Sequence, residues 1–241
     1  MSRTDIRSHL PLAPRPEPHF QWRGREVSRL EGFSDAVFAF AMTLLIVALE
    51  VPHTYEGFIG ILRGFPAFVA SFALLLVFWN SHYRYFRRYG LEDVFTRFVT
   101  YAILMLVLFS VYPLKFLFSA WLGGHHSTEH PIQTLVQLQT IYRVFGLGLG
   151  AIWALFAALY SHALRRQVQL QLTPVELLLT REAFFDSALC VSASFISVGL
   201  AELTSSEALP ALAYAMIPLG LLATGVRRRR QVRALLAPAA H

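Results

Sequence analysis

Six long apolar stretches follow one another along the chain, separated by short polar or basic junctions. Their approximate bounds are 29–51, 57–83, 95–121, 131–162, 175–202 and 207–226. A helix needs roughly 20 predominantly apolar residues to cross the hydrocarbon core of a bilayer, and each stretch meets that length. The pattern therefore predicts an all-α membrane protein with six transmembrane helices, and no long polar segment remains for a soluble domain.

Composition supports this interpretation. Of the 241 residues, 55% are hydrophobic and only 15% are charged, and the mean hydropathy of +0.49 lies well above the range of soluble domains. The single Cys190 excludes an intrachain disulfide. We expect one helical membrane domain over residues 29–226. A mobile N-terminal tail over 1–28, which contains four prolines, and a basic tail over 227–241 flank it.

The positive side chains predict how the chain is oriented in the membrane. All but three of the 21 Lys and Arg residues lie in four segments: the N-terminal tail through Arg29, the second junction through Arg97, the fourth junction through Arg181 and the C-terminal tail. The other three junctions contain none. By the positive-inside rule these four segments face the cytoplasm, so both tails are predicted to be cytoplasmic. The run of four arginines at 227–230 belongs to this signal and favours anionic lipid over nucleic acid as its partner.

Several ionisable residues fall inside the apolar stretches. Arg143 and Asp186 lie at different levels of their helices, so no pairing between them is assumed, and each is either a structural tie or a neighbour of a hydrated cavity. His82 has no second metal ligand three or four residues away and no hydrolase partner nearby in sequence. We therefore expect no enzymatic activity, cofactor or resident metal.

The first apolar stretch begins with a cluster of charged residues. Arg29, Glu31 and Asp35 crowd its start, and no charged side chain lies between Asp35 and Glu50. Three-and-four spacing on a helix gives one largely apolar face, which by itself is typical of a helix packed against its neighbours. That face comprises Phe33, Phe40, Thr43, Leu44, Val47 and Glu50.

The same stretch carries a family resemblance. The pattern R-x-x-x-F-S-D at residues 29–35, followed by an apolar run ending in V-P, resembles the signature of bacterial relatives of transmembrane protein 175, the endosomal and lysosomal potassium-channel family. The later F-W-N-S-H-Y-R-Y-F at 78–86 is similar to that family's second helix. The resemblance implies a potassium-selective channel in the bacterial inner membrane. It also implies a homotetramer of six-helix subunits whose first helix lines a central pore for K⁺.

The resemblance further implies roles for individual residues. A buried polar network would fix the pore helix. Its members would be Arg29, Phe33, Ser34, Asp35, Trp79 and His82. A hydrophobic constriction would lie at Phe40, with Leu44 and Val47 further out, and the Thr43 hydroxyl would contribute to selectivity. Phe40 departs from the aliphatic residue that the family pattern leads us to expect.

Two further expectations concern the pore itself. Four copies of Glu50 would form a ring at the outer mouth and concentrate cations there. The family lacks the carbonyl-lined filter of ordinary potassium channels, and this sequence contains no T-V-G-Y-G segment.

The alternative function is a proton-coupled secondary transporter that relays protons through Asp35 and His82. Such transporters usually contain internal repeats. Residues 181–186 are weakly similar to the motif at 29–35, but a similarity of this length is close to chance.

Overall fold

The computed structural model describes residues 17, 19–47, 51–122, 134–206 and 208–236. The described chain is helical, and six of its helices are long and apolar enough to cross a membrane, as the sequence pattern predicts. The sixth of these consists of α6, a 3-10 turn and α7 together. The elements are α1 (Arg29–Val47), α2 (Tyr55–Tyr89), α3 (Val94–Leu122), α4 (Leu135–Arg165), α5 (Pro174–Leu203), α6 (Leu209–Leu212), η1 (Ala213–Ala215) and α7 (Met216–Leu236).

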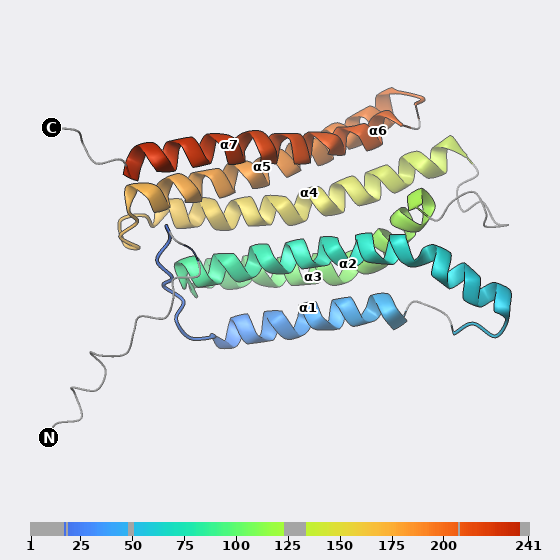
Figure 1. The fold of residues 1–241 in the computed structure, drawn as a ribbon, viewed down its shortest axis with the longest axis horizontal. Helices are drawn as coiled ribbons and strands as arrows, with labels where there is room; N and C mark the ends of the chain where they lie inside the picture. Colours follow the sequence, from blue (N-terminus) through green and yellow to red (C-terminus); the bar gives the residue numbers. More distant parts are fainter. Residues whose placement is uncertain (1–16, 18, 48–50, 123–133, 207, 237–241) are drawn as a thin grey trace, which may run out of the picture.

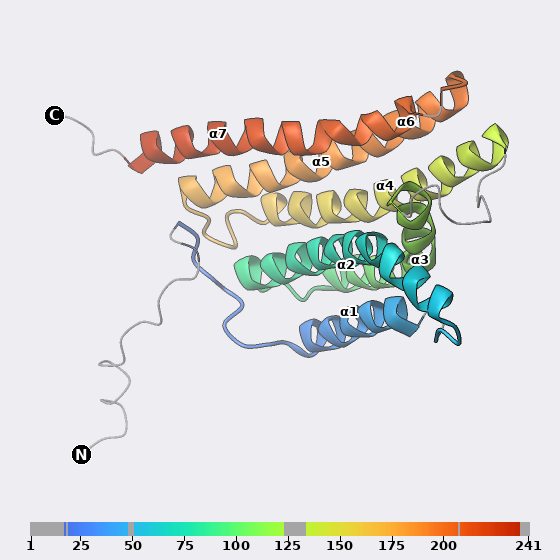
Figure 2. The same cartoon turned by 45° about the vertical axis from the view of Figure 1, so that its right-hand side comes forward.

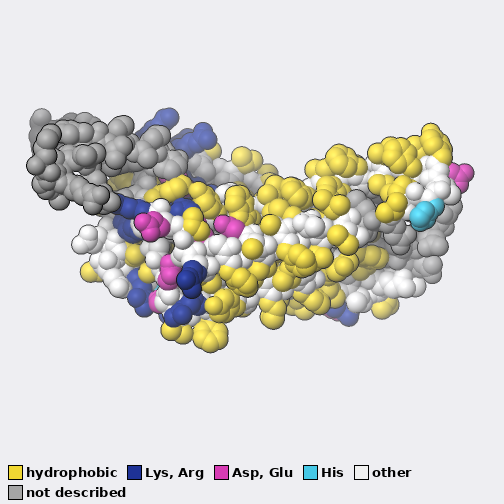
Figure 3. Space-filling view, turned by 90° about the horizontal axis from the view of Figure 1, so that it is seen from below, with side chains coloured by type: hydrophobic (Ala, Val, Ile, Leu, Met, Phe, Trp, Pro, Cys, Tyr) yellow, Lys and Arg dark blue, Asp and Glu magenta, His cyan; other side chains and the backbone are white. Residues whose placement is uncertain are grey.

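The long helices run side by side as an elongated bundle (Figure 1). α1 lies at one edge and packs on α2 and α3, α4 lies in the middle, and α5 and α7 form the opposite edge (Figures 1 and 2). The start of α1 and the ends of α2, α4 and α7 meet at the same end of the bundle. We call it the arginine-rich end, because Lys and Arg gather there (Figure 3).

Local sequence sets the helix boundaries. Thr134 and Thr173 each form a capping box with the Gln or Glu three residues later, and Gly90 ends α2 in the left-handed conformation at φ 58°. Pro66 lies inside α2 and Pro113 inside α3. Both helices bend toward the far end of the bundle (Figure 1), as expected where a proline removes a backbone N–H.

Aromatic rings fill the core between α2 and α4. Phe78 packs edge-on against Trp153 with centroids 5.7 Å apart, and Tyr85 packs against Tyr160 at the same distance. Many large apolar side chains point outward along the length of the bundle (Figure 3). A surface of this kind suits lipid or other subunits, and the charged side chains are concentrated at the arginine-rich end.

Residues on both sides of the predicted helical domain, 29–226, also contact the bundle. The described part of the expected N-terminal tail is packed on the bundle, and Phe20 is buried against the ring of Tyr89 at 5.6 Å. At the other end, α7 continues through the arginine run to Leu236, because Arg is a good helix former and Arg228 is tied to α5. The contacts of the helical domain therefore begin before Arg29 and extend beyond 226.

Candidate pore helix and its anchoring network

The two faces of α1 differ sharply in burial. Leu30, Ser34, Phe38, Ala41 and Leu45 recur at three-and-four spacing and are all buried against the bundle. The opposite face is not covered by any described part of the chain. It carries Phe33, Phe40, Thr43 and Val47.

The predicted pore residues mostly lie on this exposed face. Phe40 is 57% exposed and Val47 is 69% exposed, although both are large and apolar. The Thr43 hydroxyl is exposed and donates a hydrogen bond of 2.9 Å to the carbonyl of Ala39. Leu44 is half-buried and packs against the core, so it lies at the edge of the face rather than at its centre. Glu50 lies outside the described residues.

Asp35 bonds to the second helix. The indole Nε1 of Trp79 donates a hydrogen bond of 2.9 Å to Asp35 Oδ1, which joins two members of the predicted network. Ser34 is buried, but its hydroxyl donates to the carbonyl of Leu30 in its own helix at 2.8 Å. Arg29 is exposed, and within the described chain it makes no ion pair. The structure thus joins Asp35 to Trp79 and leaves Arg29 apart from both.

His82 is a packing group in this structure. Its ring is fully buried, 5.7 Å from the ring of Phe38 and 4.6 Å from that of Phe86, measured between centroids. Neither ring nitrogen has a hydrogen-bond partner among the described residues. His82 therefore contacts the buried face of α1 through Phe38. It makes no hydrogen bond to Asp35, although the sequence interpretation places both residues in one network.

An ion pair that the sequence interpretation misses links α1 to α2. Glu31 and Arg87 lie 3.0 Å apart, and their side chains are 3% and 12% exposed. The guanidinium of Arg87 also lies 5.4 Å over the ring of Tyr83, which stacks on Trp79 at 5.5 Å. Trp79, Tyr83 and Arg87 follow one another at four-residue spacing, so one stripe of α2 faces α1. That spacing marks the stripe in the sequence, but it does not identify Glu31 as the partner of Arg87.

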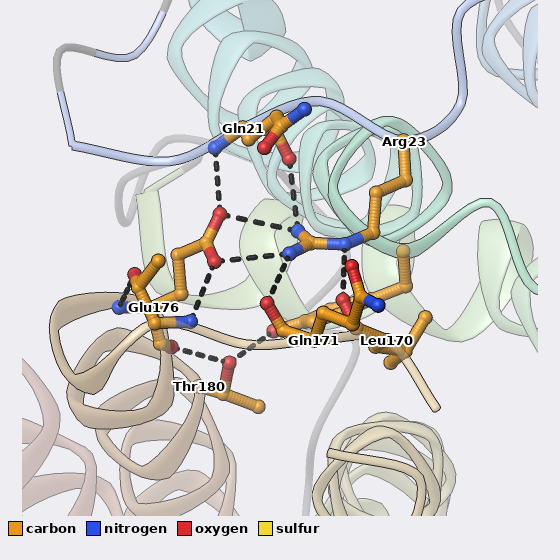
Figure 4. Close-up of polar contacts among 8 residues, drawn as sticks. Gln21, Arg23, Leu170, Gln171, Glu176 and Thr180 are labelled. Carbon is orange, nitrogen blue, oxygen red and sulfur yellow. Dashed lines mark hydrogen bonds and ion pairs between the residues drawn. The ribbon is translucent and has the colours of Figure 1, made fainter. Parts of the chain in front are cut away.

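The segment before α1 is also anchored, by a charged residue in α5. Arg23 makes a bidentate pair with Glu176, with distances of 3.1 and 3.0 Å, and donates to the carbonyls of Leu170 and Gln171 (Figure 4). The backbone N–H of Gln21 donates to the same carboxylate at 2.8 Å (Figure 4). The entry to α1 is therefore fixed to the opposite edge of the bundle.

Gly24 allows the same segment to lie against α2. The backbone N–H groups of Arg23 and Gly24 both donate to the carbonyl of Arg87 at 3.1 Å. A Cβ at Gly24 would come within 2.4 Å of the carbonyl oxygen of Phe86, a backbone atom that cannot move aside cheaply. Only a glycine fits this approach without a backbone shift.

The two intramembrane residues with open roles both have partners. Arg143 pairs with Glu202 across α4 and α5. Asp186 accepts a hydrogen bond from the Thr224 hydroxyl at 2.9 Å and pairs with Arg228 at 3.0 Å. Both residues tie helices together, and Asp186 also lines a cavity among α2, α4, α5 and α7. No group of three or more His, Cys, Asp or Glu side chains in the described ranges could hold a metal ion.

Comparisons with known proteins agree on one family. The family model described as endosomal/lysosomal potassium channel TMEM175 matches residues 29–113, which include α1, α2 and most of α3. A potassium channel of Marivirga tractuosa is 34% identical over 193 residues, which are 75% of this chain and 77% of the relative. A potassium channel of Chamaesiphon minutus is 36% identical over 96 residues, 36% of this chain and 47% of the relative.

Solved structures show the same fold. A crystal structure of a variant of the potassium channel MtTMEM175, in complex with a nanobody–MBP fusion, matches with a TM-score of 0.74 at 28% identity and covers 90% of this chain and 98% of that one. A TMEM175 homologue from Chamaesiphon minutus matches in fold with a TM-score of 0.54 at 24% identity, over 83% of this chain and 96% of that one. The fold and the long match to the Marivirga relative agree, and the chain belongs to the TMEM175 family of potassium channels.

Proposed function

We propose that this chain assembles as a homotetramer in the bacterial inner membrane and conducts K⁺ through a central pore lined by the exposed face of α1. One observation carries the proposal. α1 buries one face fully, and no element of the described chain covers the other face, on which Phe40 and Val47 are each more than half exposed. Four such faces around an axis would cover one another and enclose a path.

The residues on this face suit a narrow gate with a polar step. Phe40 and Val47 lie seven residues apart, roughly 10 Å along the helix axis, and Thr43 lies between them. Four Phe40 rings would form a hydrophobic constriction that excludes water until the rings separate. The Thr43 hydroxyl donates a hydrogen bond to the carbonyl of Ala39, so its oxygen lone pairs remain available to a passing cation.

The charge pattern supports an orientation of the chain in the membrane. The arginine-rich end would face the cytoplasm by the positive-inside rule, and the loops between α1 and α2 and between α3 and α4 would face outward. In this orientation the Glu50 ring would lie at the outer mouth. The contacts of Glu31, Asp35 and Arg23 would then hold the cytoplasmic end of α1 in place.

The geometry gives little support to the proton-coupled transporter. A relay through Asp35 and His82 needs hydrogen bonds or water between the two groups. Asp35 bonds to Trp79, while His82 is enclosed by Phe38 and Phe86, with no polar partner among the described residues. A conducting channel therefore accounts better for these two side chains.

Flux through vesicles containing the purified protein tests the proposal. Vesicles loaded with K⁺ should lose it down its gradient without any pH gradient, and matched vesicles loaded with Na⁺ should lose it more slowly. Protein-free vesicles provide the baseline. K⁺ flux that requires a proton gradient, or flux no faster than the baseline, would contradict a channel.

A further inference from the structure

A cavity lies on the other side of α2 from the proposed pore helix α1. It has a volume of about 350 Å³, within the range of small-molecule sites, and it opens among α2, α4, α5 and α7. No residue of α1 lines it. Its walls include Leu74, Val77, Leu149, Trp153, Cys190 and Leu221.

The lining changes from apolar to basic along one direction. On α2, Leu74 and Val77 are followed by Ser81, Arg84 and Arg88 at three-and-four spacing, so a single stripe runs roughly 21 Å toward the arginine-rich end. α7 repeats the order, with Ile217 and Leu221 before Arg228. Half the total thickness of a bilayer is about 20 to 22 Å. The cavity therefore matches one leaflet in length, with its basic end at headgroup level.

The arginines at the basic end differ in how far they are already neutralised. Arg88 makes two hydrogen bonds to Glu17. Arg228 pairs with Glu182 and with Asp186, the one carboxylate in the cavity lining, so that Asp186 is itself neutralised. Arg84 is exposed, and its one hydrogen bond within the described chain goes to the carbonyl of Asn80 at 3.4 Å. Arg84 is thus the guanidinium that remains available to an anion.

We propose that this cavity binds an anionic phospholipid of the leaflet at the arginine-rich end. The phosphodiester would lie against Arg84, and one acyl chain would follow Leu74 and Val77 toward Trp153. Basic pockets between transmembrane helices select anionic headgroups in this way. A zwitterionic lipid would fill the same apolar walls, but its cationic headgroup would weaken the contact with Arg84. The site is separate from the α1 face and does not depend on conduction.

Trp153 provides a direct readout, because it lines the apolar part of the cavity. Purified full-length protein in detergent is titrated with phosphatidylglycerol brominated on its acyl chains, and with brominated phosphatidylcholine. The same titration of a Trp153→Phe variant gives the signal of the other tryptophans, and subtracting it leaves the quenching of Trp153. We expect saturable quenching by phosphatidylglycerol, at about fivefold lower concentration than by phosphatidylcholine.

Three variants locate the site. Arg84→Gln should weaken the binding of phosphatidylglycerol about fivefold and leave the binding of phosphatidylcholine unchanged. Arg97 is an exposed arginine at the same end, on α3, so Arg97→Gln is the control and should change the binding of neither lipid. Val77→Phe should fill space at the apolar wall and weaken the binding of both lipids. Equal quenching by the two lipids, no saturable quenching, or an Arg84→Gln or Val77→Phe variant that behaves like wild type would each overturn the proposal.

Discussion

Glu31 at the start of α1 and Arg87 near the end of α2 form an ion pair 3.0 Å apart, and both side chains are almost fully buried. A buried ion pair is a weak source of net stability, but the loss of one partner leaves a charge without compensation. Arg87 also contacts the Gly24 carbonyl and the Tyr83 ring, so it cannot easily turn toward water. The pair therefore fixes where α1 begins relative to α2.

Glu31→Gln should lower the stability of the protein by about 3–5 kcal/mol, because the Arg87 guanidinium would remain buried without its counterion. Thermal unfolding of the purified protein measures the effect as a lower midpoint. Glu92→Gln removes an exposed carboxylate at the same end and should change the midpoint little. If Glu31→Gln and Glu92→Gln unfold at the same temperature, the pair does not hold α1. The Glu31→Gln/Arg87→Gln double variant should lose less than the sum of the two single losses.

The hydrogen bond from Trp79 to Asp35 gives a second prediction. Trp79→Phe keeps the aromatic ring but removes the donor, and hydrogen bonds to a charged group contribute about 1.5–3 kcal/mol. Asp35→Asn keeps an acceptor oxygen and should cost less than Asp35→Ala. Trp121→Phe, at the far end of α3, is the matched control for the loss of an indole. Thermal midpoints that fall equally for Trp79→Phe and Trp121→Phe would contradict a specific role for this bond.

How far the sequence alone predicts this molecule depends on the kind of contact. The hydrophobic pattern was enough to predict six helices and to place Phe40, Thr43 and Val47 on one face of α1, because helix geometry repeats within each element. The Glu31–Arg87 pair depends on how α1 and α2 lie against each other, and no single-helix pattern contains that information. Arg23 and Glu176 lie 153 residues apart, so only the tertiary fold brings them together.

The same limit explains why the contacts of the described chain differ from the expected network. Asp35, Arg29 and His82 are close in the linear pattern or in the family motif, which suggested one cluster. In the fold, Arg29 points to the surface and His82 meets Phe38 on the buried face. The motif therefore identified the right pair of helices, but only Trp79 as the direct partner of Asp35.

Asp93, in the corner between α2 and α3, provides a test by pH. Burial opposes its ionisation, but hydrogen bonds from the Thr96 N–H and from His162 more than offset this effect and lower the pKa of Asp93 to about 2. Its ordinary value is 3.8, so the ionised form is favoured in the folded state. The stability from this group is therefore fully present above pH 3.8 and is lost as the pH falls through about 2.

The wild-type thermal midpoint should accordingly fall more steeply between pH 4 and pH 2 than that of Asp93→Asn, which has no carboxyl group to protonate. Glu92→Asn, at the neighbouring exposed position, controls for the general effect of acid. Parallel curves for wild type and Asp93→Asn over this range would show that the Asp93 contacts do not stabilise the fold.

Thr43 should govern ion preference if its face lines the pore. Thr43→Val removes the hydroxyl at nearly constant volume, so potassium over sodium preference should fall while the hydrophobic gate remains. Thr140→Val is a close control, because Thr140 is also exposed and also donates to the carbonyl four residues earlier, at 2.8 Å, but it lies on α4. Reversal potentials under bi-ionic conditions measure the preference. A shift of the same size in both variants would place selectivity elsewhere.

The central claim is that the exposed face of α1 lines the conducting path, and the most direct measurement is the basal current of Phe40→Ala in planar bilayers under bi-ionic potassium and sodium. Removal of four phenyl rings should let water into the constriction and raise the current above wild type. Phe109→Ala, which truncates a Phe that is 70% exposed on α3, should leave the current unchanged. Wild-type current in Phe40→Ala, or an equal rise in Phe109→Ala, would contradict a pore lined by this face.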